Sequence, residues 1–398
     1  MKIKGLIPGL LLSCSFISMS AQLNEANEGY RFTTVKELSI TPVKNQNRTG
    51  TCWSFSGVAL IEAELLRTGK GEYDLSEMFV VHKSYVDKAD KYVRLHGFLN
   101  YAQGGSFADV LHVFKHYGAI PGEIYRGLNY DEKMHVHGEL ETASFAFVKA
   151  IAANPNGKLS PVWKNAHQAI IESYLGKIPE KFTYKGKEYS PQSFGSSLGL
   201  NMDDYVSLTS YMHEPFYTSF PLEIQDNWRW AQSYNLPLDE LMQVFDNAIQ
   251  TGYTIAWAAD VSERGFSRDG IAVVPDIEYE ETLGSDEAHW IGVSRADRDA
   301  KIKELIKNPC DEITVTQELR QKAYDNYETT DDHGMLIYGI ATDRTGKKYY
   351  LVKNSWGTDS KYKGIWYASE SFVAYKTISI VVHKDAVPKT TKSKLNIK

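Results

Sequence analysis

After Gly252 the residue composition of the chain changes, and this change constrains the fold most. Short runs rich in β-branched and aromatic residues follow one another with turn residues between them: YTIAWAADV, GMLIYGIATD, KKYYLVKNSWG, GIWYAS and ISIVVHK. Such runs are typical of β-strands. One charged segment, 297–327, interrupts them and is expected to be helical. The chain is therefore predicted to form its sheet from its final part.

The part before Gly252 is predicted to be mainly helical. Apolar residues recur at three- and four-residue spacing from Phe55 to Leu66, and Gly69 follows them. This period is that of an amphipathic helix, so Cys52 is expected in the first turn of a helix that ends before Gly69. The same signals predict further helices at 106–118, 161–175 and 237–251.

The first residues have the features of a secretory signal. Lys2 and Lys4 precede an apolar run from Leu6 to Ile17, and small residues lead to Ala21. We therefore expect residues 1–21 to be a signal peptide cleaved near Ala21, and the protein to be exported, either periplasmic or secreted. The apolar run is too short for a stable membrane span. An N-terminal anchor and a lipoprotein attached through Cys14 are the alternatives.

Composition excludes some classes of function. The chain has 398 residues, of which 42% are hydrophobic and 24% charged, as in ordinary globular proteins. Its formal net charge of -6 provides no field that would attract nucleic acid. It has three cysteines, and an export signal would remove one of them, so it is not a disulfide scaffold. A bridge between Cys52 and Cys310 would consume Cys52, and we expect Cys310 to be a free structural thiol.

Cys52 stands in a stretch, QNRTGTCWSFS, that suits a nucleophile. The thiolate is the form that attacks a carbonyl, and the positive end of a helix dipole favours it. A nucleophile also needs a proton acceptor and a group that orients this acceptor. A buried structural cysteine is the alternative when the residue is considered alone.

His333 and Asn354 can supply the two missing groups. His333 opens a predicted strand, the turn DRTGKK follows, and the returning strand ends at Asn354. Folded as an antiparallel hairpin, this segment places Asn354 beside His333, where its amide oxygen can accept the imidazole N–H. Gln46, six positions before Cys52, is predicted to pair with the Cys52 N–H as an oxyanion donor.

These residues carry a resemblance to a known family. NQNRTGTCWSFS, DHGMLIYG and VKNSWG resemble the three catalytic blocks of papain-like cysteine peptidases, in the same order. The chain has Gly50 where secreted papains have a disulfide cysteine close to the nucleophile. Three further features resemble the bleomycin hydrolase and aminopeptidase C branch: the long middle part of the chain, the stretch QGGSFADVLHVFKHYGAIP and the stretch VVHKDAVP. The resemblance covers roughly residues 30–388.

The resemblance implies an α+β, papain-like fold of two lobes, one helical and the other antiparallel and barrel-like. It implies a helical lobe at 22–120 that carries the nucleophile and a mainly helical insertion at 121–246. A β-rich lobe at 247–388 would carry the histidine and the asparagine, and 389–398 would be a C-terminal tail.

The resemblance also implies a function. Gly104 and Gly105 would hold the substrate backbone, although a plain loop before a helix cap is the alternative, and Trp356 would shield the histidine–asparagine hydrogen bond. The protein would be a cysteine-type aminopeptidase that acts on peptides, without a cofactor, and a homo-hexamer is possible. A papain-like endopeptidase and a non-catalytic peptide-binding module are the alternatives.

The C-terminal tail and three histidines bear on the site. In the resembling branch the end of the chain lies in the cleft, and its carboxylate meets the substrate amine. We therefore expect the basic tail KTTKSKLNIK to gate the cleft if it reaches that far. His135 and His137 have no third ligand at useful spacing, so no metal is expected. His289 has no returning strand with an amide partner, so it is rejected as the base.

Overall fold

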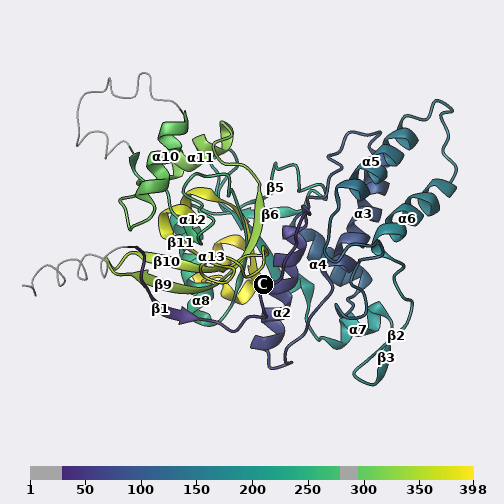
Figure 1. Cartoon of the computed structure of the whole chain (residues 1–398), viewed down its shortest axis with the longest axis horizontal. Coiled ribbons are helices and arrows are strands. Elements are labelled where there is room, and N and C mark those ends of the chain that lie inside the picture. Colours follow the sequence, from purple (N-terminus) through teal and green to yellow (C-terminus); the bar gives the residue numbers. More distant parts are fainter. Residues whose placement is uncertain (1–28, 278–294) are drawn as a thin grey trace, which may run out of the picture.

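One sheet organises half of the molecule (Figure 1). In the residues that the computed structural model describes, 29–277 and 295–398, ten strands join in the order β5-β6-β4-β12-β7-β9-β10-β11-β8, and β1 pairs with β9. Most pairs are antiparallel, whereas β8 with β11 and β4 with β6 are parallel. The barrel-like lobe implied by the resemblance is thus an open sheet in this part of the chain, because β5 and β8 remain at its two edges.

The strands of this sheet are β1 (Phe32–Glu37), β4 (Tyr205–Thr209), β5 (Ser219–Pro221), β6 (Gln232–Asn235), β7 (Ile255–Ala259), β8 (Ile271–Ala272), β9 (His333–Asp343), β10 (Lys348–Lys353), β11 (Ile365–Ser369) and β12 (Thr377–His383). A separate hairpin joins β2 (Phe182–Tyr184) to β3 (Lys187–Tyr189).

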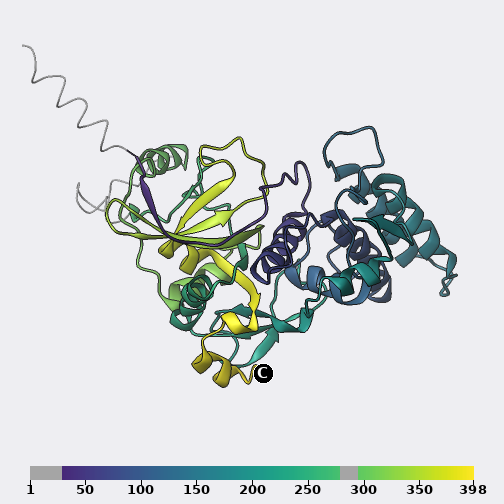
Figure 2. The ribbon, with the colours of Figure 1, turned by 90° about the horizontal axis from the view of Figure 1, so that it is seen from below.

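The helices divide between two lobes, with α2 between them in both views (Figures 1 and 2). The helical lobe contains α2 (Cys52–Arg67), α3 (Glu77–Arg94), α4 (Phe107–Tyr117), α5 (Gly138–Ala152), α6 (Val162–Leu175) and α7 (Pro191–Ser197). Around the sheet lie α8 (Leu238–Thr251), α10 (Arg295–Leu305), α11 (Gln317–Asp325), α12 (Glu370–Lys376) and α13 (Lys389–Leu395), with short 3₁₀ turns at Met202–Asp204 and Lys384–Ala386. None of the helices in the described part of the chain has the length and apolarity to cross a membrane. The expected two-lobed α+β architecture is confirmed.

Two hydrophobic cores correspond to the two lobes. The first holds α2, α3 and α4, and the second holds α8 and the middle of the sheet. Val58, Ile61 and Leu65 of α2 are fully buried, because this helix is covered by its own lobe on one side and by the sheet on the other. Burial on both sides fixes α2, and with it the position of Cys52 at its first turn.

The predicted helices are largely confirmed. The structure has all four: α2 begins at Cys52, α4 after Ser106, α6 after Pro161 and α8 after Pro237. Ser106 and Asp109 form a capping box that starts α4, which explains why this helix follows the two glycines. Segment 121–246, expected to be a mainly helical insertion, holds α5 to α7 but also strands β4 to β6 of the main sheet. The lobe boundaries stay predictions.

The C-terminal residues do not form the cleft-gating tail that we expected. Residues 389–395 form α13, and Leu395 is buried in the core of the sheet lobe. Lys394 Nζ lies 2.6 Å from Glu240 of α8, and Thr391 donates to the same carboxylate at 3.1 Å. The expectation was wrong because the tail forms an ion pair and apolar contacts with α8. In Figure 2 the tail lies below the sheet.

A loop between β5 and β6 joins the two lobes. Leu222, at its start, packs into a small core against the sheet. Arg229, near its end, binds the helical lobe through Asp87 of α3 at 2.7 Å and Asp109 of α4 at 2.5 Å. Asn227 Nδ2 donates to the carbonyls of Leu222 and Ala231, both at 3.0 Å, and thereby closes the loop on itself.

Loss of Arg229 should destabilise the protein. Arg229→Ala leaves the fully buried Asp109 without its cation, and removal of one partner of a buried ion pair typically costs about 3–5 kcal/mol. Urea unfolding should show this loss. Arg94→Ala, which breaks the exposed pair with Asp90, should change the free energy of unfolding by less than about 1 kcal/mol. Equal effects of the two variants would contradict the role given to the loop.

Candidate active site

Cys52 is the first residue of α2, as predicted, and is a free thiol. The backbone N–H groups of Gly334 and Trp53 favour the ionised form of its sulfur. Gly334 is the second residue of β9, so the thiol lies where the helix of one lobe meets a strand of the other. The first N–H groups of a helix have no partner within it, so the Cys52 N–H is free of the helical hydrogen-bond pattern.

His333 and Asn354 are paired as the hairpin predicted. His333 opens β9, which pairs with β10 in a register that sets Leu336 opposite Lys353. Asn354 follows β10, and its Oδ1 lies 2.8 Å from His333 Nε2. Both side chains are buried, at 5% and 2% exposure. Because Oδ1 can only accept, it fixes the tautomer with the proton on Nε2 and leaves Nδ1 as the base.

Trp356 lies against the imidazole. Its ring centroid is 4.7 Å from that of His333, and the two rings are inclined by 33°. Phe266 and Trp366 contact the other parts of the indole edge-on. The indole is still 39% exposed, so it covers the histidine while facing solvent itself. This arrangement suits the shielding that the resemblance implied.

Gln46 is hydrogen-bonded to Ser355, the residue that follows Asn354. Its Oε1 accepts from Ser355 Oγ at 2.5 Å, and its Nε2 donates to the Thr49 carbonyl at 2.7 Å. An amide nitrogen carries two protons, so one N–H of Gln46 remains for another acceptor. Gln46 is absent from the lining of the cavity at Cys52, so its oxyanion role stays a prediction.

Gly104 and Gly105 lie on the other side of the nucleophile. Gly105 lines a cavity of about 30 Å³ together with Cys52, His333 and Gly334. A side chain at Gly105 would come within 2.8 Å of the Trp53 ring, which explains the need for glycine there. Gly104 faces the carboxylate of Asp226 rather than open space.

Burial disfavours the charged forms of both reacting groups. It raises the pKa of Cys52 to about 12, against the opposing effect of the Gly334 N–H. It lowers the pKa of His333 to about 4, although the hydrogen bond to Asn354 acts in the other direction. The free site therefore holds a thiol beside a neutral imidazole, and transfer of the thiol proton to His333 creates no net charge in the buried site.

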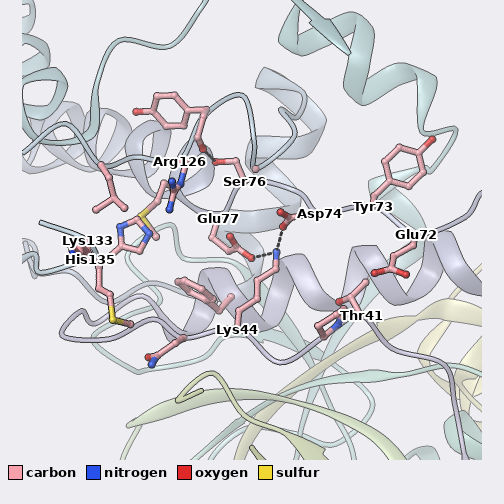
Figure 3. A pocket seen from close by; sticks show the side chains of 18 residues that line it. Thr41, Lys44, Glu72, Tyr73, Asp74, Ser76, Glu77, Arg126, Lys133 and His135 are labelled. Atoms are coloured by element: carbon pink, nitrogen blue, oxygen red, sulfur yellow. Dashed lines mark hydrogen bonds and ion pairs between the residues drawn. The ribbon is translucent and has the colours of Figure 1, made fainter. Parts of the chain in front are cut away.

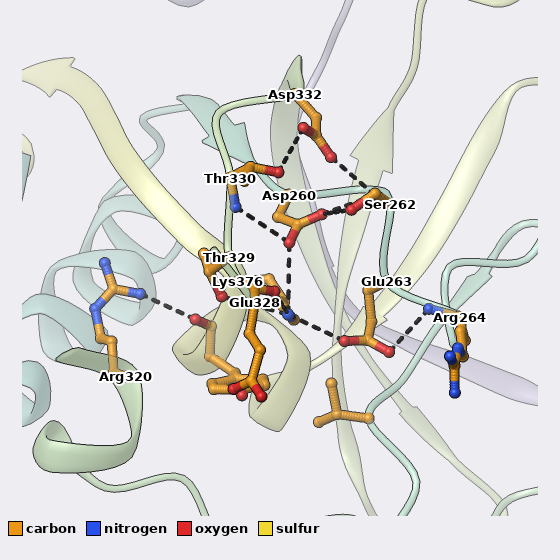
Figure 4. A network of polar contacts seen from close by, with 12 residues as sticks. Asp260, Ser262, Glu263, Arg264, Arg320, Glu328, Thr329, Thr330, Asp332 and Lys376 are labelled. Atoms are coloured by element: carbon orange, nitrogen blue, oxygen red, sulfur yellow. Dashed lines mark hydrogen bonds and ion pairs between the residues drawn. The ribbon is translucent and has the colours of Figure 1, made fainter. Parts of the chain in front are cut away.

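A polar network fixes the segment that leads into His333 (Figure 4). Lys376, almost fully buried, donates to the Glu328 carbonyl at 2.6 Å and lies 3.0 Å from Glu263 and 3.5 Å from Asp260. Asp260 Oδ2 accepts from the Thr330 N–H at 3.3 Å. These contacts hold residues 328–332 and thereby set the direction in which β9 begins.

A larger cavity of about 480 Å³ lies beside α2, but Cys52 is not among its lining residues (Figure 3). Lys44 crosses it and binds Glu77 and Asp74, both at 2.6 Å. His135 also lines this cavity, with its ring 5.7 Å from that of His137. In residues 29–277 and 295–398, no cluster of three or more metal-ligating side chains includes these histidines. His289, Cys14 and the proposed cleavage site near Ala21 lie outside the described residues.

Three aspartates in the small cavity were not predicted from the sequence. Asp226, Asp331 and Asp332 line it together with Cys52, and Asp332 accepts hydrogen bonds from the Ser262 N–H and the Thr330 hydroxyl. Asp331 stands only two positions before His333, and this proximity could have marked it. Asp226 lies in the loop between β5 and β6, and nothing in its local sequence, EIQDNWRW, indicates that the loop reaches Cys52.

Comparisons with known proteins agree with this geometry. Residues 30–160 match the papain family cysteine protease model and residues 310–398 the Peptidase C1-like family model. Aminopeptidase C of Lactococcus lactis subsp. lactis is 21% identical over 386 residues, which cover 88% of this chain and 82% of that protein. Aminopeptidase C of Streptococcus thermophilus is 22% identical over 421 residues, which cover 92% and 85%. The crystal structure of PepW from Lactobacillus rhamnosis shares the fold, with a TM-score of 0.68, 18% identity and coverage of 95% and 90%.

The reactivity of Cys52 should depend on the protonation of His333. Because the pKa of His333 is lowered to about 4, the imidazole stays neutral down to that pH and can accept the thiol proton. The rate of Cys52 alkylation by iodoacetamide, followed by peptide mapping, should stay level from pH 7 to 5 and fall as the pH drops through about 4. Circular dichroism at each pH serves as the control for unfolding. A midpoint near 6.5, the ordinary value for histidine, would contradict the buried neutral base.

Proposed function

We propose that the chain is a papain-like cysteine peptidase of the aminopeptidase C family and that it removes N-terminal residues from peptides through an acyl-enzyme on Cys52. The observation that carries the proposal is the 2.8 Å contact between His333 Nε2 and Asn354 Oδ1, beside a thiol at the start of a helix. Relatives named aminopeptidase C over most of the chain support the same activity.

The residues of the site divide the reaction between them. His333 Nδ1 takes the proton of Cys52, and the sulfur attacks the carbonyl carbon of the first peptide bond. The Cys52 N–H and the remaining N–H of Gln46 stabilise the oxyanion that forms. His333 then gives its proton to the leaving amine. A water molecule, activated by the same imidazole, releases the N-terminal residue and restores the thiol.

The cleft favours removal of terminal residues over internal cleavage. In a papain-like endopeptidase the substrate backbone would run along Gly104 and Gly105. Asp226 lies over Gly104 in this chain, so its carboxylate stands in the path that a longer substrate chain would take along the glycine pair. A non-catalytic binding module is disfavoured because Cys52, His333, Asn354 and Gln46 are all present.

Export and assembly are further parts of the proposal. The N-terminal pattern of residues 1–21 supports an exported protein, and the family resemblance supports a homo-hexamer. The acidic net charge of -6 supports peptides rather than nucleic acid as partners.

Cys52→Ala should abolish peptide hydrolysis and leave the fold intact. The change removes one sulfur atom, so its cost in packing is small, and no other residue can form the acyl-enzyme. Hydrolysis of alanine coumarylamide should fall to background in purified Cys52→Ala. Cys310→Ser, which changes the other free thiol of the described residues, should keep the rate. Residual activity of more than a few percent in Cys52→Ala would exclude Cys52 as the nucleophile.

Asn354→Ala should reduce turnover without removing it. The variant lacks the acceptor that orients His333, and proton transfer by a positioned side chain typically contributes about 10²–10⁴-fold to the rate. We expect kcat to fall at least about tenfold with a smaller change in KM. Asn156→Ala, in an exposed loop, is the control. An unchanged kcat in Asn354→Ala would contradict the positioning role of this residue.

A further inference from the structure

Two carboxylates face the cavity beside Cys52 without a partner of their own. Asp226 comes from the loop between β5 and β6, and Asp331 precedes β9 by two residues. Among residues 29–277 and 295–398, neither carboxylate takes part in a hydrogen bond or an ion pair. The fully buried carboxylates of Asp109 and Glu62 have such partners. Asp226 and Asp331 are half-buried and line the cavity, so both remain available to a ligand there.

Asp226 occupies the place where a substrate chain would pass. A Cβ added to Gly104 would collide with its carboxylate, so this group lies directly against the backbone of the glycine pair. Ile224 of the same loop and Gly105 line the cavity as well. The carboxylate thus lies in the same cavity as Cys52 and against the glycine pair.

The loop holds Asp226 in a defined position. Asn227 closes the loop through its side-chain amide, and Trp228 is buried at 3% exposure. Arg229 binds two acidic residues of the helical lobe. Residues on both sides of Asp226 are therefore fixed, and its position in the cleft is a built feature rather than one state of a free loop.

The cation that favours the ionised form of Asp226, Lys88, is already engaged. Its ammonium group donates to the carbonyls of Ala102 at 2.8 Å and Gly104 at 2.5 Å. Burial raises the pKa of Asp226 to about 6, against the effect of Lys88. Burial and the neighbouring Asp226 raise the pKa of Asp331 to about 8. Both shifts mean that the empty cavity disfavours two ionised carboxylates side by side, and a bound cation would favour the ionised form of both.

We propose that Asp226 and Asp331 bind the α-ammonium group of the substrate and so select free N-termini. The proposal rests on the peptidase function proposed above. One residue then fits between the ammonium group and the scissile carbonyl, which makes the cleavage that of an aminopeptidase. The geometry is complementary, because an ammonium group has three donors and both carboxylates line the cavity that contains Cys52. The C-terminal residues have no part in it, since α13 is held on α8.

The test compares two substrates that differ only in the amine. Alanine coumarylamide carries the free ammonium group, and N-acetylalanine coumarylamide has lost it. For Asp226→Asn and Asp331→Asn, kcat/KM on the free substrate should fall at least about tenfold, because a buried charge loses its partner. On the acetylated substrate kcat/KM should stay equal or rise. Cys52 alkylation by iodoacetamide in each variant verifies that the nucleophile is in place.

Glu223→Gln is the matched control. It removes the same charge from the same loop, but its side chain is 75% exposed and does not line the cavity. It should keep the wild-type ratio of the two rates. If both cavity variants also keep this ratio while the wild type hydrolyses the free substrate, the ammonium site is overturned and the peptidase function stands. If the wild type hydrolyses neither substrate, the proposed function fails and the ammonium site fails with it.

Discussion

The close approach of strand β9 to the first turn of α2 is the contact on which the rest of the structure depends. A Cβ at Gly334 would lie 3.2 Å from the Trp53 Cα and from the Phe107 ring, so any other residue would have to push the two elements slightly apart. The approach brings the Gly334 N–H, which favours the Cys52 thiolate, and the neighbouring His333 into one cavity with Cys52. Backbone contact between two lobes, each with its own core, thus determines the geometry of the nucleophile and its base.

The electrostatics of the site follow from the same burial. Burial favours the neutral forms of the thiol and the imidazole, so charge appears only when the proton moves from one to the other. The thiol and the imidazole must keep their relative positions during this proton transfer. The Asn354 amide and the Trp356 ring hold the imidazole in place, and the Lys376–Asp260 network fixes the segment before it. Each of these groups holds His333 without adding charge at the reacting atoms.

The sequence predicted those features that are encoded locally. The period of α2, the start of α4 after Ser106 and the register of the β9–β10 hairpin each depend on neighbouring residues, and each is found in the structure. Features that depend on distant partners were missed. Asp226 reaches Cys52 because Arg229 meets Asp87 and Asp109, more than a hundred residues away in the chain. Likewise α13 follows from Glu240 and the core on α8, and not from its own lysine-rich sequence.

The ion pairs of Arg229 are better explained by geometry than by stability. A buried ion pair is often no more stabilising than apolar residues of similar volume, since both charges lose their water. Apolar residues at these positions would bury the loop equally well but would not fix its direction. A guanidinium group that binds two carboxylates in separate helices does fix it, and the residue it orients is Asp226, three positions earlier. The ion pairs of this loop therefore position the Asp226 carboxylate in the cleft. Through this carboxylate they contribute to the selection of the substrate.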